Sequence, residues 1–332
     1  MDSGNGRILN MNYKIKKISG DASFREFYRI RKGKNTSIIV HANKDKFKNL
    51  ITYSVINNIL ILNKINAPKL ISNHLKHNMI QISDLGEKSF YNHIYYKKNK
   101  LQDYKSSIRL IIKLQKIKIK NSYRLGKFKI KLKNYSLVNL HKESDLFFDW
   151  YLKYCLKKNN LRKIKKILRK ELNNVYKKLV FKNDTFVHRD FHASNIMIKK
   201  NKLGLIDSQD AILGNPLYDV VSLIDDVRIK LPNSLQKKLI EFYHSKSKLR
   251  NEKIEKLKND FDILSLQRNL KILGIFVRLF KRDHKPYYLK YLSYTWQLIE
   301  KRLKNPLFKN LNYLLKKNLS LKKIKKKNFY EN

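Results

Sequence analysis

The chain has 332 residues and carries 75 lysines and arginines against 26 acids, which gives a formal net charge of +49 at pH 7. Its single cysteine, Cys155, excludes an intrachain disulfide and any metal site built from several thiolates. No apolar run of about 18 residues is present, so the sequence predicts no membrane-spanning helix. We expect a cytoplasmic protein that works as a monomer and has no membrane partner.

A positive charge of this size is typical of nucleic-acid binding, where lysines and arginines neutralise phosphates. Here, however, the lysines are spread along the whole chain and accompany an excess of Asn, Ile, Tyr and Phe, whose codons are A/T-rich. Glycine and proline, with 9 and 5 copies, are correspondingly scarce. We therefore interpret the charge mainly as a consequence of genome base composition, and we expect no nucleic-acid partner.

The N-terminal quarter of the chain has the pattern of a small sheet. Residues 1–11 have no periodic pattern, which predicts a disordered leader and makes Met11 an alternative start. Residues 13–43 alternate apolar and polar side chains in three short runs, as in a β-meander. Apolar residues at helical spacing follow over 44–66, and then two more strands. Residues 12–86 are therefore predicted to form a five-stranded antiparallel sheet with one helix.

The rest of the chain is mostly helical in its periodicity. Amphipathic patterns predict long helices over 101–118, 143–158, 161–179, 260–283 and 287–303. Residues 316–332 are so rich in lysine that we expect a frayed or disordered basic tail. The predicted fold class is α+β, with a small β-rich N-lobe at 12–86 and a larger helical C-lobe at 87–315.

The stretch FVHRDFHASNIMIKKNKLGLIDSQDA, residues 186–211, gathers acids in a chain that otherwise has few. NIMI and LGLID flank a turn and predict a β-hairpin, so Asn195 before one strand and Asp207 after the other lie at the same end. Asp190 lies in the loop that leads into the hairpin. Two carboxylates and an amide oxygen suit Mg²⁺, which keeps several waters and also binds substrate phosphates.

The spacing His188-Arg189-Asp190-x-x-x-x-Asn195 is that of a kinase catalytic loop. In this pattern the aspartate orients the acceptor hydroxyl and the asparagine binds the metal, and a second aspartate after the hairpin completes the set. The sequence therefore predicts Asp190 as the catalytic residue, and Asn195 and Asp207 as ligands of a Mg²⁺ ion that is bound together with ATP.

Five neighbouring residues have predicted supporting or substrate roles. His188 is expected to hold the loop in place, and Asp219, at the start of a helix, to accept backbone N–H groups and brace the same loop. Arg189 and His192 are either substrate contacts or exposed loop residues. Asp210 either assists the metal or caps a turn.

These motifs resemble those of the aminoglycoside phosphotransferase and choline kinase-like family, which has the protein-kinase-like fold. Three further segments are similar to the anomeric kinases of N-acetylmuramate and N-acetylglucosamine within this family: GDASFREFYRI, ISDLG and LQRNLKILGIFVRL. The similarity extends from about Ile18 to about Leu298. It implies a bilobal kinase that uses ATP and Mg²⁺ to phosphorylate the C1 hydroxyl of an amino sugar, in the recycling of cell-wall sugars.

The same segments give candidate contacts to both substrates. Backbone N–H groups of Ala22, Ser23 and Phe24 are predicted to cover the ATP phosphates. By the same resemblance, the backbone of Ser83, Asp84 and Leu85 borders the adenine. Gln267, Arg268 and Lys271 share one helix face and either contact the sugar or its carboxylate, or form a solvated surface.

One kinase feature is missing from the sequence. Many kinases clamp the ATP phosphates with a strand lysine that is paired to a helix glutamate. Here His41 stands where that lysine would be sought, and the helix predicted over 44–66 contains no glutamate. Lys44 is the nearest substitute.

Two alternatives remain open at this stage. The acceptor could instead be choline, homoserine or an aminoglycoside, although the C-terminal half has few acids to bind a polycationic antibiotic. A non-catalytic protein that binds nucleic acid on a kinase-like scaffold is the alternative from a different class. It gives no reason for Asp190, Asn195 and Asp207 to occur together.

Overall fold

The computed structural model describes residues 13–18, 25–43 and 47–330. The predicted leader 1–11, the alternative start Met11, and the candidate ATP contacts Ala22, Ser23, Phe24 and Lys44 lie outside the described residues. The chain forms two compact units. The first consists of Met1–Glu87, Tyr123–Ile130 and Met197–Gln209, and the second of Lys88–Ser122, Lys131–Ile196 and Asp210–Asn332.

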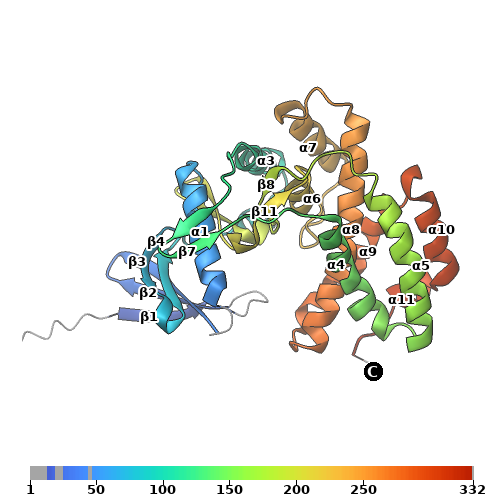
Figure 1. Cartoon of the computed structure of the whole chain (residues 1–332), viewed down its shortest axis with the longest axis horizontal. Helices are drawn as coiled ribbons and strands as arrows, with labels where there is room; N and C mark the ends of the chain where they lie inside the picture. The colour runs from blue at the N-terminus through green and yellow to red at the C-terminus, as the bar shows by residue number, and fades with distance from the viewer. Residues whose placement is uncertain (1–12, 19–24, 44–46, 331–332) are drawn as a thin grey trace, which may run out of the picture. The chain divides into compact units, whose positions relative to one another are not determined.

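The first unit is built on a five-stranded sheet whose strand order is β1-β2-β3-β5-β4 (Figure 1). Every neighbouring pair is antiparallel. The strands are β1 Tyr13–Ile18, β2 Arg25–Lys32, β3 Asn35–Ala42, β4 Leu70–His74 and β5 Met79–Ser83. One helix, α1 Phe47–Leu62, lies between β3 and β4 in the chain. The predicted sheet and helix are therefore confirmed.

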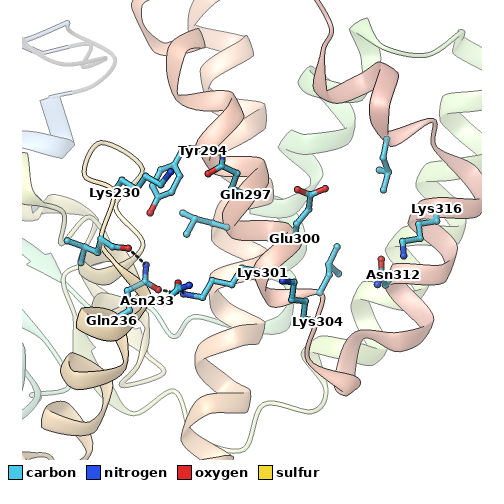
Figure 2. Close-up of a pocket in the computed structure, with 14 residues that line it drawn as sticks. Lys230, Asn233, Gln236, Tyr294, Gln297, Glu300, Lys301, Lys304, Asn312 and Lys316 are labelled. Atoms are coloured by element: carbon cyan, nitrogen blue, oxygen red, sulfur yellow. Dashed lines mark hydrogen bonds between the residues drawn. The ribbon is translucent and has the colours of Figure 1, made fainter.

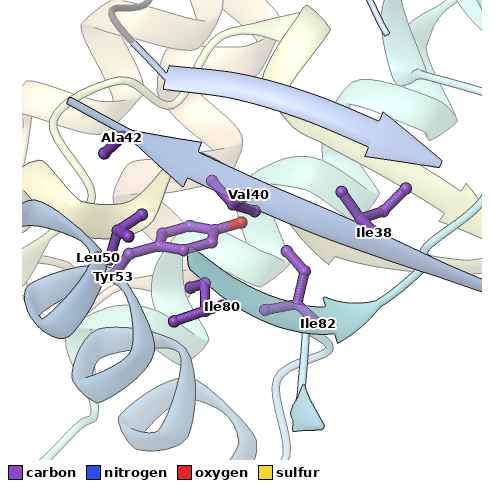
Figure 3. Close-up of a cluster of buried hydrophobic side chains, with 7 residues drawn as sticks. All are labelled: Ile38, Val40, Ala42, Leu50, Tyr53, Ile80 and Ile82. Carbon is purple, nitrogen blue, oxygen red and sulfur yellow. The ribbon is translucent and has the colours of Figure 1, made fainter. Parts of the chain in front are cut away.

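The core of this unit follows from the alternation of β3 and β5 (Figure 3). Side chains two apart point to the same face of a strand, and on β3 these are Ile38 and Val40. Across the ladder Ile38 pairs with Ile82, and Val40 with Ile80. The helix residues Leu50 and Tyr53, which are 0% and 2% exposed, cover these pairs.

Two later hairpins complete the first unit, although the sequence placed every residue after 86 in the second lobe. The hairpin β6 Tyr123–Leu125 and β7 Phe128–Ile130 packs on α1, where the rings of Phe47 and Phe128 are 6.4 Å apart. The hairpin β9 Ile196–Lys199 and β10 Lys202–Leu205 pairs through Gly204 with Asn66. The local periodicity of a sequence does not predict such long-range contacts. For this reason the sequence assigned both hairpins to the second lobe.

The second unit is mainly helical. Its helices are α2 Phe90–Ile94, α3 Leu101–Gln115, α4 Leu137–Leu146, α5 Lys158–Tyr176, α6 Tyr218–Ile224, α7 Asn233–Lys246, α8 Ile254–Lys281, α9 Leu292–Arg302, α10 Lys309–Asn318 and α11 Leu321–Lys325. Two short strands, β8 Thr185–Val187 and β11 Ile212–Gly214, pair antiparallel. The helix expected over 143–158 is interrupted, because α4 ends in a π-helical turn at Phe147–Tyr151.

The prediction of a disordered tail at 316–332 is wrong for residues 316–330. Leu319, Ile324 and Phe329 are each at most 3% exposed. The Tyr151 hydroxyl donates to the carbonyl of Ile324 at 2.6 Å, and its ring contacts that of Phe329 at 5.2 Å. Lys322, Lys323 and Lys326 between these apolar residues are exposed, so the segment is amphipathic and packs. Among the described helices, none has the length and apolar character needed to cross a bilayer.

Candidate active site

The predicted catalytic loop follows the buried strand β8 in the second unit. Its backbone is held by Asp219, in the first turn of α6, whose carboxylate accepts the N–H of His188 at 2.7 Å and that of Arg189 at 2.9 Å. Asp219 and His188 are 1% and 0% exposed. Arg189 has a φ of 76°, a left-handed conformation that a non-glycine residue adopts only when its surroundings enforce it. The position of Asp190 is therefore fixed by contacts on the preceding residues.

A second set of contacts fixes the end of the loop. Asp226 accepts the N–H of Ala193 at 3.0 Å. The side-chain nitrogen of Asn195 donates to the carbonyl of Asp190 at 3.0 Å and lies 3.2 Å from a ring nitrogen of His192. Because the amide nitrogen faces the loop, the amide oxygen of Asn195 is the atom that remains to bind a metal ion.

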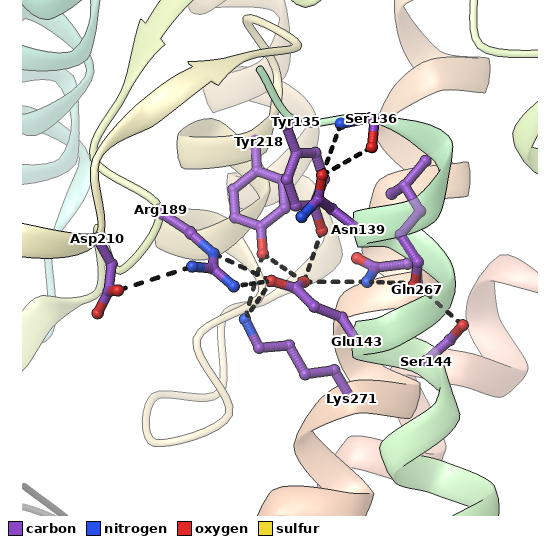
Figure 4. Close-up of polar contacts among 11 residues, drawn as sticks. Tyr135, Ser136, Asn139, Glu143, Ser144, Arg189, Asp210, Tyr218, Gln267 and Lys271 are labelled. Carbon is purple, nitrogen blue, oxygen red and sulfur yellow. Dashed lines mark hydrogen bonds and ion pairs between the residues drawn. The ribbon is translucent and has the colours of Figure 1, made fainter. Parts of the chain in front are cut away.

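Glu143 of α4 organises the cations beside the loop (Figure 4). Arg189 donates through Nε and Nη2 to its Oε1 at 3.0 and 2.5 Å, and Lys271 Nζ lies 3.1 Å from the same oxygen. Burial opposes the charge of Glu143, but these two cations outweigh it, so the pKa of Glu143 lies well below its ordinary value. Glu143 is thus an anion that pairs two cations.

The other oxygen of Glu143 accepts three neutral donors. The hydroxyls of Tyr135 and Tyr218 donate at 2.6 and 3.0 Å, and Gln267 Nε2 donates at 3.1 Å (Figure 4). The sequence did not single out Glu143. No motif marks it, and only the tertiary packing of α4 against α8 reveals its role.

The structure decides several alternatives that the sequence left open. Gln267, Arg268 and Lys271 are 0%, 5% and 8% exposed, so the interpretation of a solvated helix face is wrong. Arg189 is not a free loop residue, because its guanidinium binds Glu143. Asp210 is 46% exposed at its side chain and lies 3.8 Å from Arg189.

Electrostatics keep Asp190 ionised. Burial alone would raise its pKa, but the cations Lys271, Arg268 and Arg189 lower it below the ordinary aspartate value. His192 shows the opposite effect, since burial and the nearby cations lower its pKa well below the usual range and leave it neutral. A charged carboxylate is thus available next to a neutral imidazole.

In the first unit, Asp207 lies at the end of β10 and forms an ion pair with Arg25 of β2. Arg25 is 5% exposed and also donates to Gln209 at 2.8 Å, and its guanidinium lies over the ring of Tyr53. Asp207 has a φ of 62°. Arg25 therefore supplies a buried cation beside Asp207, in the unit where the sequence left the phosphate-binding lysine unassigned. The sequence signal was available, because Arg25 belongs to the GDASFREFYRI segment.

Ser83 and Asp84, two of the three candidate adenine contacts, form hydrogen bonds within the first unit. The backbone N–H of Ser83 donates to the carbonyl of Lys69 at 2.8 Å, and the Asp84 carboxylate binds Arg29 and the N–H of Gly86. The carbonyl of Asp84 accepts a bond from Lys199. Leu85 differs from these two residues, since it lines a pocket of about 260 Å³ in the first unit, together with Asn66, Met197, Lys199, Lys200, Lys202 and Gly204.

The two predicted metal ligands belong to different units, Asn195 to the second and Asp207 to the first. Among the described residues, no cluster of three or more His, Cys, Asp or Glu side chains could hold a metal ion. The donor types still fit Mg²⁺, which binds through one or two carboxylates and takes its other ligands from water and phosphate.

A pocket of about 600 Å³ lies elsewhere in the second unit (Figure 2). Lysines 230, 301, 304 and 316 are among its lining residues, and none of the predicted site residues is. Lys301 donates to Asn233 and Gln236, and Lys230 lies over the ring of Tyr294. This pocket is therefore separate from the catalytic loop.

Comparison with known proteins supports the predicted family. An N-acetylmuramate/N-acetylglucosamine kinase from Pseudomonas aeruginosa is 26% identical over 279 residues, which cover 82% of this chain and 78% of that protein. A protein of the same name from Neisseria meningitidis is 24% identical over 275 residues, covering 81% and 80%.

Solved structures confirm the kinase-like fold. A choline kinase from Cryptosporidium parvum aligns with a TM-score of 0.62 at 12% identity and covers 93% of this chain and 95% of its own. An ADP-bound aminoglycoside phosphotransferase aligns with a TM-score of 0.59 at 14% identity, covering 89% and 95%. Residues 14–253, more than two thirds of the chain, match the Phosphotransferase enzyme family, and the chain therefore belongs to this family.

Proposed function

We propose that this phosphotransferase uses ATP and Mg²⁺ to phosphorylate the anomeric C1 hydroxyl of N-acetylmuramate or N-acetylglucosamine, in the recycling of cell-wall sugars. Membership of the family supports phosphoryl transfer. The names of the relatives that match over most of the chain support the acceptor. The proposal keeps the cytoplasmic location and the monomeric state expected from the sequence.

The single observation that carries this proposal is the state of Asp190. It is held on a loop whose backbone is bonded to Asp219, and nearby cations keep its pKa below the ordinary value. An ionised carboxylate can accept a hydrogen bond from the acceptor hydroxyl and take its proton. An anomeric hydroxyl is more acidic than an ordinary alcohol, which makes this proton transfer easier.

The roles of the other residues follow from their chemistry. Mg²⁺ bound with ATP supplies charge neutralisation for a loose phosphoryl-transfer transition state. The amide oxygen of Asn195 and the carboxylate of Asp207 would hold the ion. The protein's own contribution is then mainly to hold the acceptor oxygen in the orientation for attack and to stabilise the charge of the transition state.

The test is a coupled assay of ADP release with ATP, Mg²⁺ and a panel of N-acetylmuramate, N-acetylglucosamine, choline, homoserine and an aminoglycoside. We expect release with the amino sugars, and a loss of about 10²- to 10⁴-fold in kcat for Asp190→Asn, the range typical of a general base. Asp184→Asn is the matched control, because Asp184 is exposed and lies six residues upstream in the same segment.

The outcomes separate the parts of the proposal. Acceptor-dependent ADP release no greater than that of Asp190→Asn for any compound would refute kinase activity. ADP release with choline alone would refute the amino-sugar acceptor but leave the proposed phosphoryl transfer intact. NMR of the product distinguishes a C1 phosphate from a C6 phosphate.

A further inference from the structure

The buried face of α8 presents three polar side chains beside the catalytic loop, and two of them bind Glu143. Lys271 forms an ion pair with Glu143 at 3.1 Å, and Gln267 donates to the same carboxylate at 3.1 Å. Arg268, which is 5% exposed, makes neither contact. Of these three side chains, Arg268 is therefore the one whose charged group is not bound to Glu143.

Arg268 is a buried cation that forms no ion pair with any of the residues that the structure describes. Its Nε is buried and has no hydrogen-bond partner, and no hydrogen bond or ion pair to its guanidinium occurs within residues 13–18, 25–43 and 47–330. Burying a charged group without a partner costs several kcal/mol. A fold carries such a cost at a site where an incoming anion removes it.

Arg302 of α9 shows how this fold treats a structural arginine. It is 6% exposed, almost the same as Arg268. Its guanidinium binds Asp225 through two bonds of 2.7 and 2.8 Å and reaches Asp262 at 3.2 Å. The contrast indicates that Arg268 is not one more core ion pair.

The surroundings of Arg268 locate the missing anion near the reaction. Its positive charge acts on Asp190, His192, Tyr218 and Asp219, yet it bonds to none of them. A guanidinium presents a planar fork of N–H donors that matches the two oxygens of a carboxylate. An acidic group on the acceptor, close to the hydroxyl that Asp190 orients, fits both conditions.

We propose that Arg268 binds the carboxylate of an acidic amino sugar and selects it over a neutral one. The inference rests on the proposed function, whose two candidate sugars differ in this respect: N-acetylmuramate carries a lactyl carboxylate on the ring, and N-acetylglucosamine has a free hydroxyl in its place. Arg268 is thus a specificity residue for the acceptor, whereas Asn195 and Asp207 are the proposed ligands of the Mg²⁺ ion that is bound with ATP.

The experiment compares steady-state kinetics of the full chain with both sugars in the wild type, Arg268→Met and Arg268→Lys. For Arg268→Met we expect KM for N-acetylmuramate to rise about 10- to 100-fold, as for the loss of a charge-assisted pair. The kcat/KM for N-acetylglucosamine should change less than about threefold. Arg268→Lys should recover part of the affinity. Lys258→Met, on the exposed face of the same helix, is the matched control and should change neither.

Two results would overturn the inference. An equal fall in kcat with both sugars would show that Arg268 acts on the transferred phosphoryl group, and unchanged kinetics with both would show that it has no ligand. Circular dichroism of each variant excludes unfolding as the cause.

A binding measurement without ATP separates this inference from the proposed function. Calorimetry with N-acetylmuramate and with its uncharged methyl ester should show tighter binding of the acid to the wild type and no preference in Arg268→Met. If the wild type binds acid and ester equally, the inference fails. If it prefers the acid but transfers no phosphate to any sugar, only the proposed function fails.

Discussion

Asp219 combines two properties that oppose each other. Burial raises the pKa of Asp219 to about 7, and the hydrogen bonds from the N–H groups of His188 and Arg189 offset only part of this rise. The nearby Asp190 raises the pKa further, and Arg268 lowers it. The ionised form of Asp219 accepts both N–H groups most strongly, but it is also the form that burial destabilises. The catalytic loop is therefore held best above the pKa of Asp219, where the buried charge lowers the stability of the folded protein.

The raised pKa of Asp219 predicts how the stability of the protein changes with pH. The pKa of Asp219 is about 7 in the folded protein and about 4 in the unfolded chain. Between these values only the folded protein holds the proton, so the free energy of unfolding falls as pH rises from about 4 to 7. The fall is at most about 1.4 kcal/mol per pH unit. Activity should rise over the upper part of the same range, because the loop becomes braced.

Asp219→Asn removes the ionisation and retains a similar shape. Urea unfolding at several pH values between 5 and 8 should show a shallower decline for this variant than for the wild type, and its kcat should lose the rise near pH 7. Asp184→Asn, with its exposed side chain, controls for the general loss of a carboxylate. Parallel pH curves for Asp219→Asn and the wild type would refute the assignment.

At the scale of elements, α8 is the longest helix among the described residues and carries the site's arginine and lysine. It packs closely on α4, the helix that bears Glu143. The two helices approach closely at Gly274, where an added Cβ would lie 2.2 Å from the carbonyl oxygen of Leu146. That oxygen belongs to the backbone and cannot rotate away, so the glycine sets the distance between the two helices.

Gly274→Ala should therefore destabilise the protein although alanine is the better helix former. The gain in helix propensity is about 1 kcal/mol, whereas overpacking of a core costs about 1–3 kcal/mol and occasionally more. We expect a net loss of up to about 2 kcal/mol in urea unfolding and reduced activity, because Glu143 moves relative to Lys271. The control Lys258→Ala, at an exposed position of α8, should stay within about 0.5 kcal/mol of the wild type. A stabilised Gly274→Ala variant would contradict the packing argument.

The elements also show what a sequence can and cannot predict. The alternation of β3 and β5 and the short turn between β9 and β10 are local, so the sheet and the hairpin were predicted. The turn residues Lys200 and Asn201 have φ of 48° and 58°, as a tight hairpin turn requires. Glu143 could not be found in this way, because its role depends on partners from four other segments of the chain. The sequence predicts for Arg268 the same alternatives as for Gln267 and Lys271, and only the absence of a contact with Glu143 in the fold distinguishes it from these two residues.

For the whole molecule, the distribution of charge matters more than its total. Cations outnumber acids 75 to 26 along the chain. Among the buried side chains of the described residues the order is reversed: the acids are Asp84, Glu143, Glu171, Asp219, Asp225, Asp226 and Asp260, and the cations are Arg25, Arg268, Lys271 and Arg302. Acids thus outnumber cations in the interior, where several of them hold loops and pair arginines, while the excess of lysine lies on the surface. This arrangement supports a solvated background charge.

The last segment of the chain tests whether lysine-rich sequence can still be part of the fold. Phe329 is 2% exposed and contacts the ring of Tyr151, which also bonds to Ile324 and to Trp296. Phe329→Ala should lower the free energy of unfolding by about 3 kcal/mol, the low end for a buried phenylalanine. Lys323→Ala, at an exposed position in α11, should change it by less than about 0.5 kcal/mol. A disordered tail would make both substitutions neutral, and a tail stabilised by its charges would make the lysine the more costly loss. A large effect at Phe329 and none at Lys323 would show that the buried apolar side chain of Phe329, and not the lysine charge around it, holds this segment against the core.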